Sequence, residues 1–230
     1  VELSNTNNEL LKRLSEVAPG TFQHSMQVAN LATEVANKIG AKALLVRTGA
    51  LYHDIGKMNS PAYFTENQNN FNPHDRISYE QSAAIVISHV KDGLKLADKY
   101  NLPQVIKDFI STHHGKGKTK YFLISYKNQH PDQTVDESIF TYPGPNPFTL
   151  EQAILMMADS VEAASRSLNE YTEESISALV DKIVDCQVQE GFFKDCPITF
   201  HDITVAKDVF REKLKTIYHT RISYPELKKK

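Results

Sequence analysis

The segment His53-Asp54-Ile55-Gly56-Lys57 follows an apolar stretch that runs from Ala41 to Tyr52. A histidine directly followed by an aspartate places an imidazole nitrogen and a carboxylate side by side. One metal ion that lies over the helix edge can bind both groups. The second oxygen of Asp54 would let it reach another ion. Gly56 is expected to end the helix with a positive φ angle. Lys57 would then emerge near the metals, as a cation suited to a phosphate.

Apolar residues recur at helical spacing along most of the chain, which predicts an all-α fold. Residues 59–77 and 131–147 are rich in polar and turn-forming residues and are expected to be loops. Capping boxes are expected at Ser78 and Thr149, and Thr21 is expected to cap the second helix. The expected helices cover, in order, residues 10–17, 21–39, 41–52, 78–97, 103–113, 121–126, 149–166, 172–191 and 199–222.

Composition limits the functions open to this chain. Its 230 residues are 40% hydrophobic and 23% charged, which suits a globular protein with a sizeable core. The net charge of −2 gives no general attraction to nucleic acid or acidic membranes. Cys186 and Cys196 are expected to be reduced thiols, and no apolar run approaches the length of a membrane span. The chain opens at Val1 without a methionine, as expected for a piece of something longer.

A set of histidines and aspartates accompanies His53 and Asp54 on the predicted helices. Buried imidazoles and carboxylates are costly without partners, and so many in one fold are hard to satisfy except by metal. Nitrogen and carboxylate ligands without cysteine favour manganese, iron or zinc over calcium. The candidate metal ligands are His24, His53, Asp54, His89, His113, His114 and Asp159.

The order His, His-Asp, His, His-His, Asp resembles the binuclear branch of the HD phosphohydrolase superfamily. A single-metal member would match only His24, His53, Asp54 and Asp159. Four further segments resemble the cytoplasmic domain of the seven-transmembrane HD proteins, which are bacterial cyclic di-AMP phosphodiesterases. They are His113-His114-Gly115-Lys116-Gly117, Lys120-Tyr121-Phe122, Tyr142-Pro143-Gly144-Pro145 and the segment from Ala158 to Arg166.

This resemblance covers Leu14 to Pro225, so a single HD domain is expected over residues 1–230, with its core at about 14–225. The fold implied is one helical bundle with a binuclear metal centre. The chain lacks the Gly-Tyr-Pro signature at a short distance after His114, which separates it from the HD branch that hydrolyses cyclic di-GMP.

The resemblance also implies roles for individual residues. His24, His53, Asp54 and Asp159 would hold one metal, and Asp54, His89, His113 and His114 the other, with Asp54 bridging. The two ions would be divalent transition metals, manganese or iron, and a hydroxide between them would attack the phosphorus and convert cyclic di-AMP to pApA. Asp54 and Lys57 are the expected catalytic residues, and Lys57, Lys116 and Arg166 the expected substrate contacts.

Alternatives stay open for the cationic residues and for the function. Lys57 is also consistent with a solvated lysine, Lys116 with a charged loop, and Arg166 with an ion pair to Glu162 one turn earlier. The alternative functions are a binuclear hydrolase of another substrate, such as cyclic di-GMP, and an inactive module that senses a cyclic dinucleotide.

The resemblance implies the cytoplasmic domain of a bacterial inner-membrane protein, joined to the membrane only through an N-terminal part that this sequence lacks. Its partner would be cyclic di-AMP and not a nucleic acid polymer. The oligomeric state is left open, with a dimer as one option.

Overall fold

The computed structural model describes residues 2–219, and in that part of the chain the structure is all-α, as the sequence predicts. An isolated antiparallel bridge between Lys118 and Thr141 is the one β pairing in this part. The α-helices within it are α1 (Glu9–Val17), α2 (Pro19–Ile39), α3 (Ala43–Tyr52), α4 (Tyr79–Lys99), α5 (Gln104–Thr112), α6 (Lys120–Gln129), α7 (Leu150–Ser165), α8 (Glu173–Gln189) and α9 (Phe200–His219). Short 3-10 helices connect them: η1 (Glu2–Ser4), η2 (Ile55–Asn59), η3 (Pro61–Tyr63), η4 (Thr65–Asn67), η5 (Pro73–Arg76) and η6 (Glu137–Phe140).

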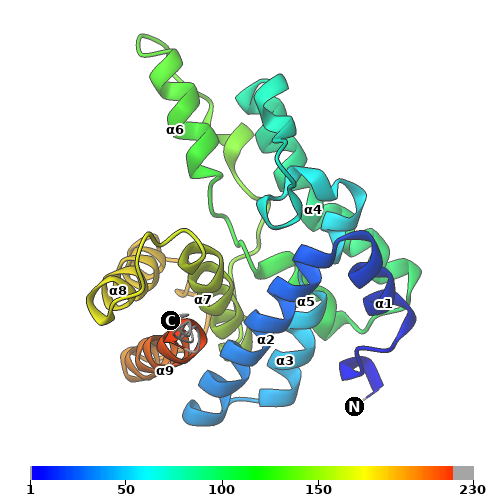
Figure 1. Ribbon diagram of the computed structural model, residues 1–230, viewed down its shortest axis with the longest axis vertical. Coiled ribbons are helices and arrows are strands. Elements are labelled where there is room, and N and C mark those ends of the chain that lie inside the picture. The colour runs from blue at the N-terminus through cyan, green and yellow to red at the C-terminus, as the bar shows by residue number, and fades with distance from the viewer. Residues whose placement is uncertain (1, 220–230) are drawn as a thin grey trace, which may run out of the picture.

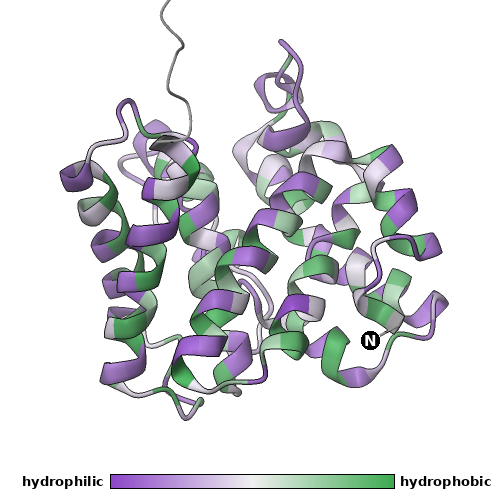
Figure 2. Cartoon of the chain, turned by 60° about the horizontal axis from the view of Figure 1, so that its bottom comes forward, coloured by the Kyte–Doolittle hydropathy of each residue, from purple (hydrophilic) through white to green (hydrophobic). Residues whose placement is uncertain are grey.

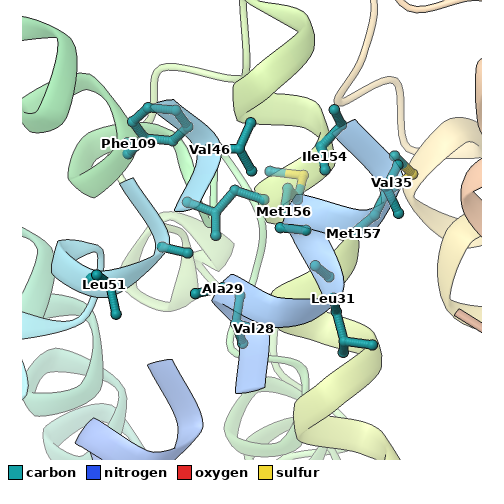
Figure 3. Packing of buried hydrophobic residues seen from close by; sticks show 14 of the residues in the cluster. Val28, Ala29, Leu31, Val35, Val46, Leu51, Phe109, Ile154, Met156 and Met157 are labelled. Atoms are coloured by element: carbon teal, nitrogen blue, oxygen red, sulfur yellow. The ribbon is translucent and has the colours of Figure 1, made fainter. Parts of the chain in front are cut away.

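Helix α2 lies at the centre of the molecule and packs against α1, α3, α7 and α9 (Figure 1). Its apolar residues recur at helical spacing, so they form one continuous buried face. Val28 and Leu31 lie on this face, in the same buried cluster as Leu51 of α3 and Met157 of α7 (Figure 3). The other long helices also carry hydrophobic and hydrophilic residues on different sides (Figure 2). Burial of these apolar faces is the main force that assembles the bundle.

Most of the helix starts and ends agree with the expected ones. Ser78 forms a complete capping box with Gln81, and Gly191 follows α8 with a φ of 77°. At Thr149 only half of the expected box forms, because the side chain of Gln152 accepts a hydrogen bond from Phe148 instead of Thr149.

The predicted start of the second helix at Thr21 is wrong. Pro19 occupies the first turn of α2, a position where its missing N–H costs nothing. Thr21 is therefore buried inside the helix, and its hydroxyl donates to Glu66 Oε1 at 3.0 Å. This contact fastens the segment after η2 to the start of α2.

The role predicted for Gly56 is also wrong. Gly56 lies inside η2 and is not among the described glycines with a positive φ. What it permits is a close approach, since a Cβ atom there would lie 1.8 Å from the carbonyl oxygen of His89 in α4. The missing side chain of Gly56 lets η2 contact the backbone of α4 directly.

Residues 59–77 are a connection with three short 3-10 helices, η3, η4 and η5, rather than an irregular loop. Beyond α5, helix α6 projects from the top of the molecule in Figure 1, away from α8 and α9. Cys186 and Cys196 are free thiols, as predicted.

The predicted last helix and the domain boundary both reach past the described residues. Residues 220–222 of the expected helix and 220–225 of the expected core lie outside them. None of the described helices is both long and apolar enough to cross a membrane.

Candidate metal centre

The structure brings all seven candidate ligands together at the junction of five helices. His24 comes from α2 and His89 from α4, and each lies on the inward face of its helix. His53 and Asp54 directly follow α3, and the His113-His114 pair follows α5, so helix ends deliver two neighbouring side chains to one place. Asp159 completes the set from α7.

The first group consists of His24, His53, Asp54 and Asp159, whose ligand atoms all lie within 4.8 Å of one another. Nε2 of His24 lies 2.8 Å from Oδ1 of Asp159, and Nε2 of His53 lies 3.4 Å from the same oxygen. Oδ2 of Asp54 faces this group, at 3.3 Å from Nε2 of His53. All four residues are buried.

The second group consists of Asp54, His89, His113 and His114, again within 4.8 Å. Oδ1 of Asp54 lies 3.3 Å from Nε2 of His89 and 3.4 Å from Nε2 of His113. The ring of Tyr142 stacks on His114, with the centroids 4.3 Å apart. The two oxygens of Asp54 therefore face different groups, the arrangement that a bridging carboxylate needs.

Hydrogen bonds hold the Nδ1 nitrogen of His24, His53, His89 and His113 in place. Nδ1 of His53, His89 and His113 lies 2.6, 2.5 and 2.8 Å from the carbonyl oxygen three residues earlier in the chain. Such a bond places a proton on Nδ1 and directs Nε2, the other ring nitrogen, toward the candidate metal position. His24 uses a side chain instead, because its Nδ1 is hydrogen-bonded to the carboxylate of Glu162.

Buried atoms without hydrogen-bond partners show that these residues fit metal ions. Neither oxygen of Asp54 nor Nε2 of His53 has such a partner among the described residues, although Lys57 Nζ makes an ion pair 2.7 Å from Oδ2 of Asp54. Unpaired buried groups of this kind are costly. Divalent cations at the two groups would satisfy them, and the nitrogen and oxygen donors suit transition metals.

The electrostatics of the first group favour cations. Burial alone would raise the pKa of Asp54, but His53 and Lys57 hold it well below its usual range. Burial likewise opposes the ionisation of Asp159, yet the neighbouring imidazoles of His24 and His53 keep its pKa well below the usual range. Burial by itself would lower the pKa of His53, but the two carboxylates raise it to about 10. The group therefore holds two ionised carboxylates that attract positive charge.

The second group presents neutral imidazoles. Burial lowers the pKa of His113 below its usual value, despite the nearby carboxylate of Asp54. Burial, together with the neighbouring His113 and His89, holds the pKa of His114 well below its usual value. A neutral imidazole is the form of histidine that binds metal.

Lys57 lies beside the centre, and its side chain is 11% exposed. Its Nζ contacts Asp54 and also lies 2.9 Å from Oε1 of Glu66, and it lies over the ring of Phe64. Burial disfavours the charged amine, but the carboxylates of Asp54 and Glu66 overcome this and raise its pKa. Lys57 is thus a fixed ammonium group beside Asp54 and not a solvated lysine.

The other two predicted substrate contacts differ in their placement. Arg166 lies at the end of α7 and pairs with Glu162 Oε2 at 3.2 Å, which confirms the ion-pair alternative. It lines a cavity of about 410 Å³ beside the first group, which His24 and Glu66 also line. Lys116 is exposed, and its side chain lies against Gly144 rather than in this cavity.

Sequence reasoning missed two carboxylates and one aromatic ring at the centre. Glu66 pairs with Lys57, Glu162 holds His24, and Tyr142 covers His114. Only Glu162 carries a local signal, because it lies one turn after Asp159 on the same helix. The contacts of Glu66 and Tyr142 with the centre cannot be read from any spacing.

Comparison with known proteins agrees with this geometry. The sequence matches the HD domain family over residues 21–164. It is 47% identical over 227 residues to "Cyclic-di-AMP phosphodiesterase PgpH" of Listeria monocytogenes, covering 98% of this chain and 31% of that protein. It is 42% identical over 231 residues to the protein of the same name from Bacillus subtilis, covering 100% of this chain and 32% of that protein.

A solved structure also resembles this one. The HD domain of L. monocytogenes PgpH in complex with cyclic-di-AMP superposes with a TM-score of 0.89 at 46% identity, covering 94% of this chain and all of that chain. The present chain spans about a third of the length of the curated relatives. With the family matched over more than half of its residues and its histidines and aspartates gathered into one centre, this chain belongs to the HD domain family.

Proposed function

We propose that this chain is a metal-dependent phosphodiesterase that hydrolyses cyclic di-AMP to pApA. The observation that carries the proposal is the pair of ligand groups that share Asp54. Two ions held close together are typical of enzymes that cleave phosphate esters. The substrate follows from the relatives, which are named for cyclic-di-AMP and of which one HD domain is solved with that molecule.

The chain's own residues prepare the site for this reaction. Manganese or iron ions at the two groups would lower the pKa of a water molecule and neutralise charge on the phosphodiester. Asp54 fixes the separation of the groups, because its two oxygens face different sides. The backbone carbonyls behind His53, His89 and His113 fix the direction of their lone pairs. Such preorganisation avoids the cost of reordering the ligands during the reaction.

Cationic side chains near the centre are the proposed substrate contacts. The ammonium of Lys57 lies 2.7 Å from Asp54, so it can donate to a phosphate or leaving oxygen held at the two groups. The cavity lined by Arg166 lies beside the first group and has room for part of a dinucleotide. Lys116 lies two residues beyond His114 and adds a positive charge to the segment that follows it.

We also propose that the chain works as the cytoplasmic domain of a bacterial membrane protein. The support is its similarity to one third of much longer relatives. The proposal makes cyclic di-AMP, and not a nucleic acid polymer, the partner of this domain.

The substrate assignment predicts a preference among cyclic dinucleotides. After loading with manganese or iron, the purified chain is expected to convert cyclic di-AMP to pApA. Its kcat/KM is expected to exceed that for cyclic di-GMP by about tenfold or more, or about 1.4 kcal/mol. Competition between the two substrates at equal concentration, followed by chromatography of the products, measures this ratio. Equal specificity constants would overturn the substrate, and no turnover of either by the loaded protein would favour an inactive sensor.

The two groups predict the metal content. Protein prepared without chelator is expected to hold about two equivalents of transition metal per chain, since Asp54 serves both groups. Elemental analysis measures this value. Chelator is expected to lower the melting temperature, because a ligand that binds only the folded state stabilises it. Saturation at one equivalent would contradict the binuclear assignment.

A further inference from the structure

His24 differs from the other three candidate ligand histidines that have an Nδ1 partner. His53, His89 and His113 lie against backbone carbonyls, whose position is set by their own helix. Nδ1 of His24 is instead hydrogen-bonded to a carboxylate 138 residues away in the sequence, that of Glu162. We propose that Glu162 is a positioning residue that sets the metal affinity of the first group through His24. This inference rests on the metal centre of the proposed function.

The geometry places Glu162 behind the ligands and not among them. Asp159 and Glu162 lie one turn apart on α7, so the same helix face supplies a direct ligand and the support of another ligand. Asp159 approaches Nε2 of His24 at 2.8 Å, while Glu162 takes the opposite nitrogen of the same ring. The ring of His24 is therefore held from both sides by α7.

A third residue holds the carboxylate in turn. Arg166, one further turn along α7, lies 3.2 Å from Oε2 of Glu162, and its guanidinium reaches to 3.4 Å from Nδ1 of His24. Burial is graded along this series, since the side chain of Glu162 is 10% exposed and that of Arg166 is 37% exposed. The guanidinium of Arg166 therefore fixes the carboxylate of Glu162 behind His24, at the border of the cavity.

As a carboxylate, Glu162 is a stronger hydrogen-bond acceptor than the neutral backbone carbonyls behind the other histidines. A carboxylate that accepts the Nδ1 proton fixes the tautomer of the imidazole and increases the electron density at Nε2. Loss of such a support weakens metal binding by about 10- to 100-fold in comparable sites. The second group does not contain His24, so its affinity is expected to be independent of Glu162.

The test compares three variants with the wild-type chain. Glu162→Ala removes the support, and Glu162→Gln keeps the shape and an acceptor oxygen but removes the charge. Glu151→Gln is the matched control, because Glu151 lies at the start of the same helix and accepts from the backbone N–H of Lys42. Each protein is stripped of metal and titrated with Mn²⁺ in a chelator-buffered solution, and both binding steps are fitted. Circular dichroism and the melting temperature of the metal-free forms report the fold.

The expected result is selective. In Glu162→Ala one binding step weakens by about 10- to 100-fold and the other does not change, and Glu162→Gln shows a smaller loss in the same step. Glu151→Gln binds as the wild type does. Unchanged steps in Glu162→Ala, or equal weakening of both steps, would overturn the role of Glu162.

The same titration separates this inference from the substrate. Wild-type protein that binds two ions but does not cleave cyclic di-AMP would contradict the proposed substrate and leave the Glu162 result standing. Wild-type protein that takes up no Mn²⁺ would overturn both.

Discussion

Asp54→Ala is expected to abolish turnover and to weaken metal binding at both groups. Oδ2 of Asp54 faces His53 and Oδ1 faces His89 and His113, so one substitution removes a ligand from each group. Removal of a single electrostatic stabiliser from an active site already costs about 10²–10³ in kcat. A loss of about 10³-fold or more is therefore expected here. By contrast, His89→Ala removes a ligand from the second group alone and is expected to spare the first.

The measurement pairs kcat with metal titration of the same protein. Asp54→Asn keeps the size of the side chain, so a loss that persists in it arises from the charge and the second oxygen. Asp75→Ala is the control, since Asp75 is an exposed carboxylate on η5. The helical fold is expected to persist, because the core is built by other residues. Substantial activity in Asp54→Ala, or a loss of one ion only, would show that Asp54 does not bridge.

The grouping of the seven candidate ligands could be predicted because each of them has a local signature in the sequence. His53 and Asp54 end an apolar helix, and the His113-His114 pair ends another. His24, His89 and Asp159 lie on apolar helix faces, whose period of 3.6 residues tells which side is buried. A buried polar residue on such a face needs a partner, and this requirement gathers the candidates without knowledge of their distances.

The supports of the ligands could not be predicted in the same way. Glu66 pairs with Lys57 from the segment after η2, which hydrogen bonds of Thr21 with Glu66 and Asn67 fasten to α2. Tyr142 reaches His114 from a turn-rich segment whose path no period describes. These contacts are set by tertiary packing, which sequence spacing does not record.

Gly56 shows the same limit. The sequence alone does not distinguish a glycine that is needed for a turn from a glycine that is needed because another backbone packs closely against it. The position of Gly56 after a predicted helix favours a positive φ angle, because glycine often ends a helix in this conformation. The structure instead places Gly56 against α4, where Gly93 N would lie 2.5 Å from an added Cβ atom. Two elements beside the candidate centre, η2 next to Asp54 and α4 with His89, meet at this residue.

Gly56→Ala is therefore expected to damage both stability and the metal centre. Its Cβ atom would lie 1.8 Å from the carbonyl oxygen of His89. This oxygen belongs to the backbone of a packed helix, which cannot move away by a change of rotamer as a side chain can. Overpacking of this kind costs about 3 kcal/mol. In a chain of this length that corresponds to a melting temperature about 6–12 °C lower. Because the clash separates His89 from Asp54, metal affinity at the second group is expected to fall with it.

Two further glycines make the result interpretable. Gly40→Ala is the control, because Gly40 has a φ of 77° but nothing within 4 Å of an added Cβ atom. It is expected to lose about 1–2 kcal/mol from backbone strain alone and to bind metal normally. Gly93→Ala tests the same contact more gently, since its Cβ atom would meet the Cγ2 methyl group of Ile110 at 2.9 Å and Gly56 N at 3.4 Å, and, among the described residues outside its own helix, no backbone atom at a shorter distance. Thermal melts with and without Mn²⁺, together with metal titration, measure all three variants. If Gly56→Ala and Gly93→Ala both bind metal as Gly40→Ala does, the direct contact between η2 and α4 does not position the second group.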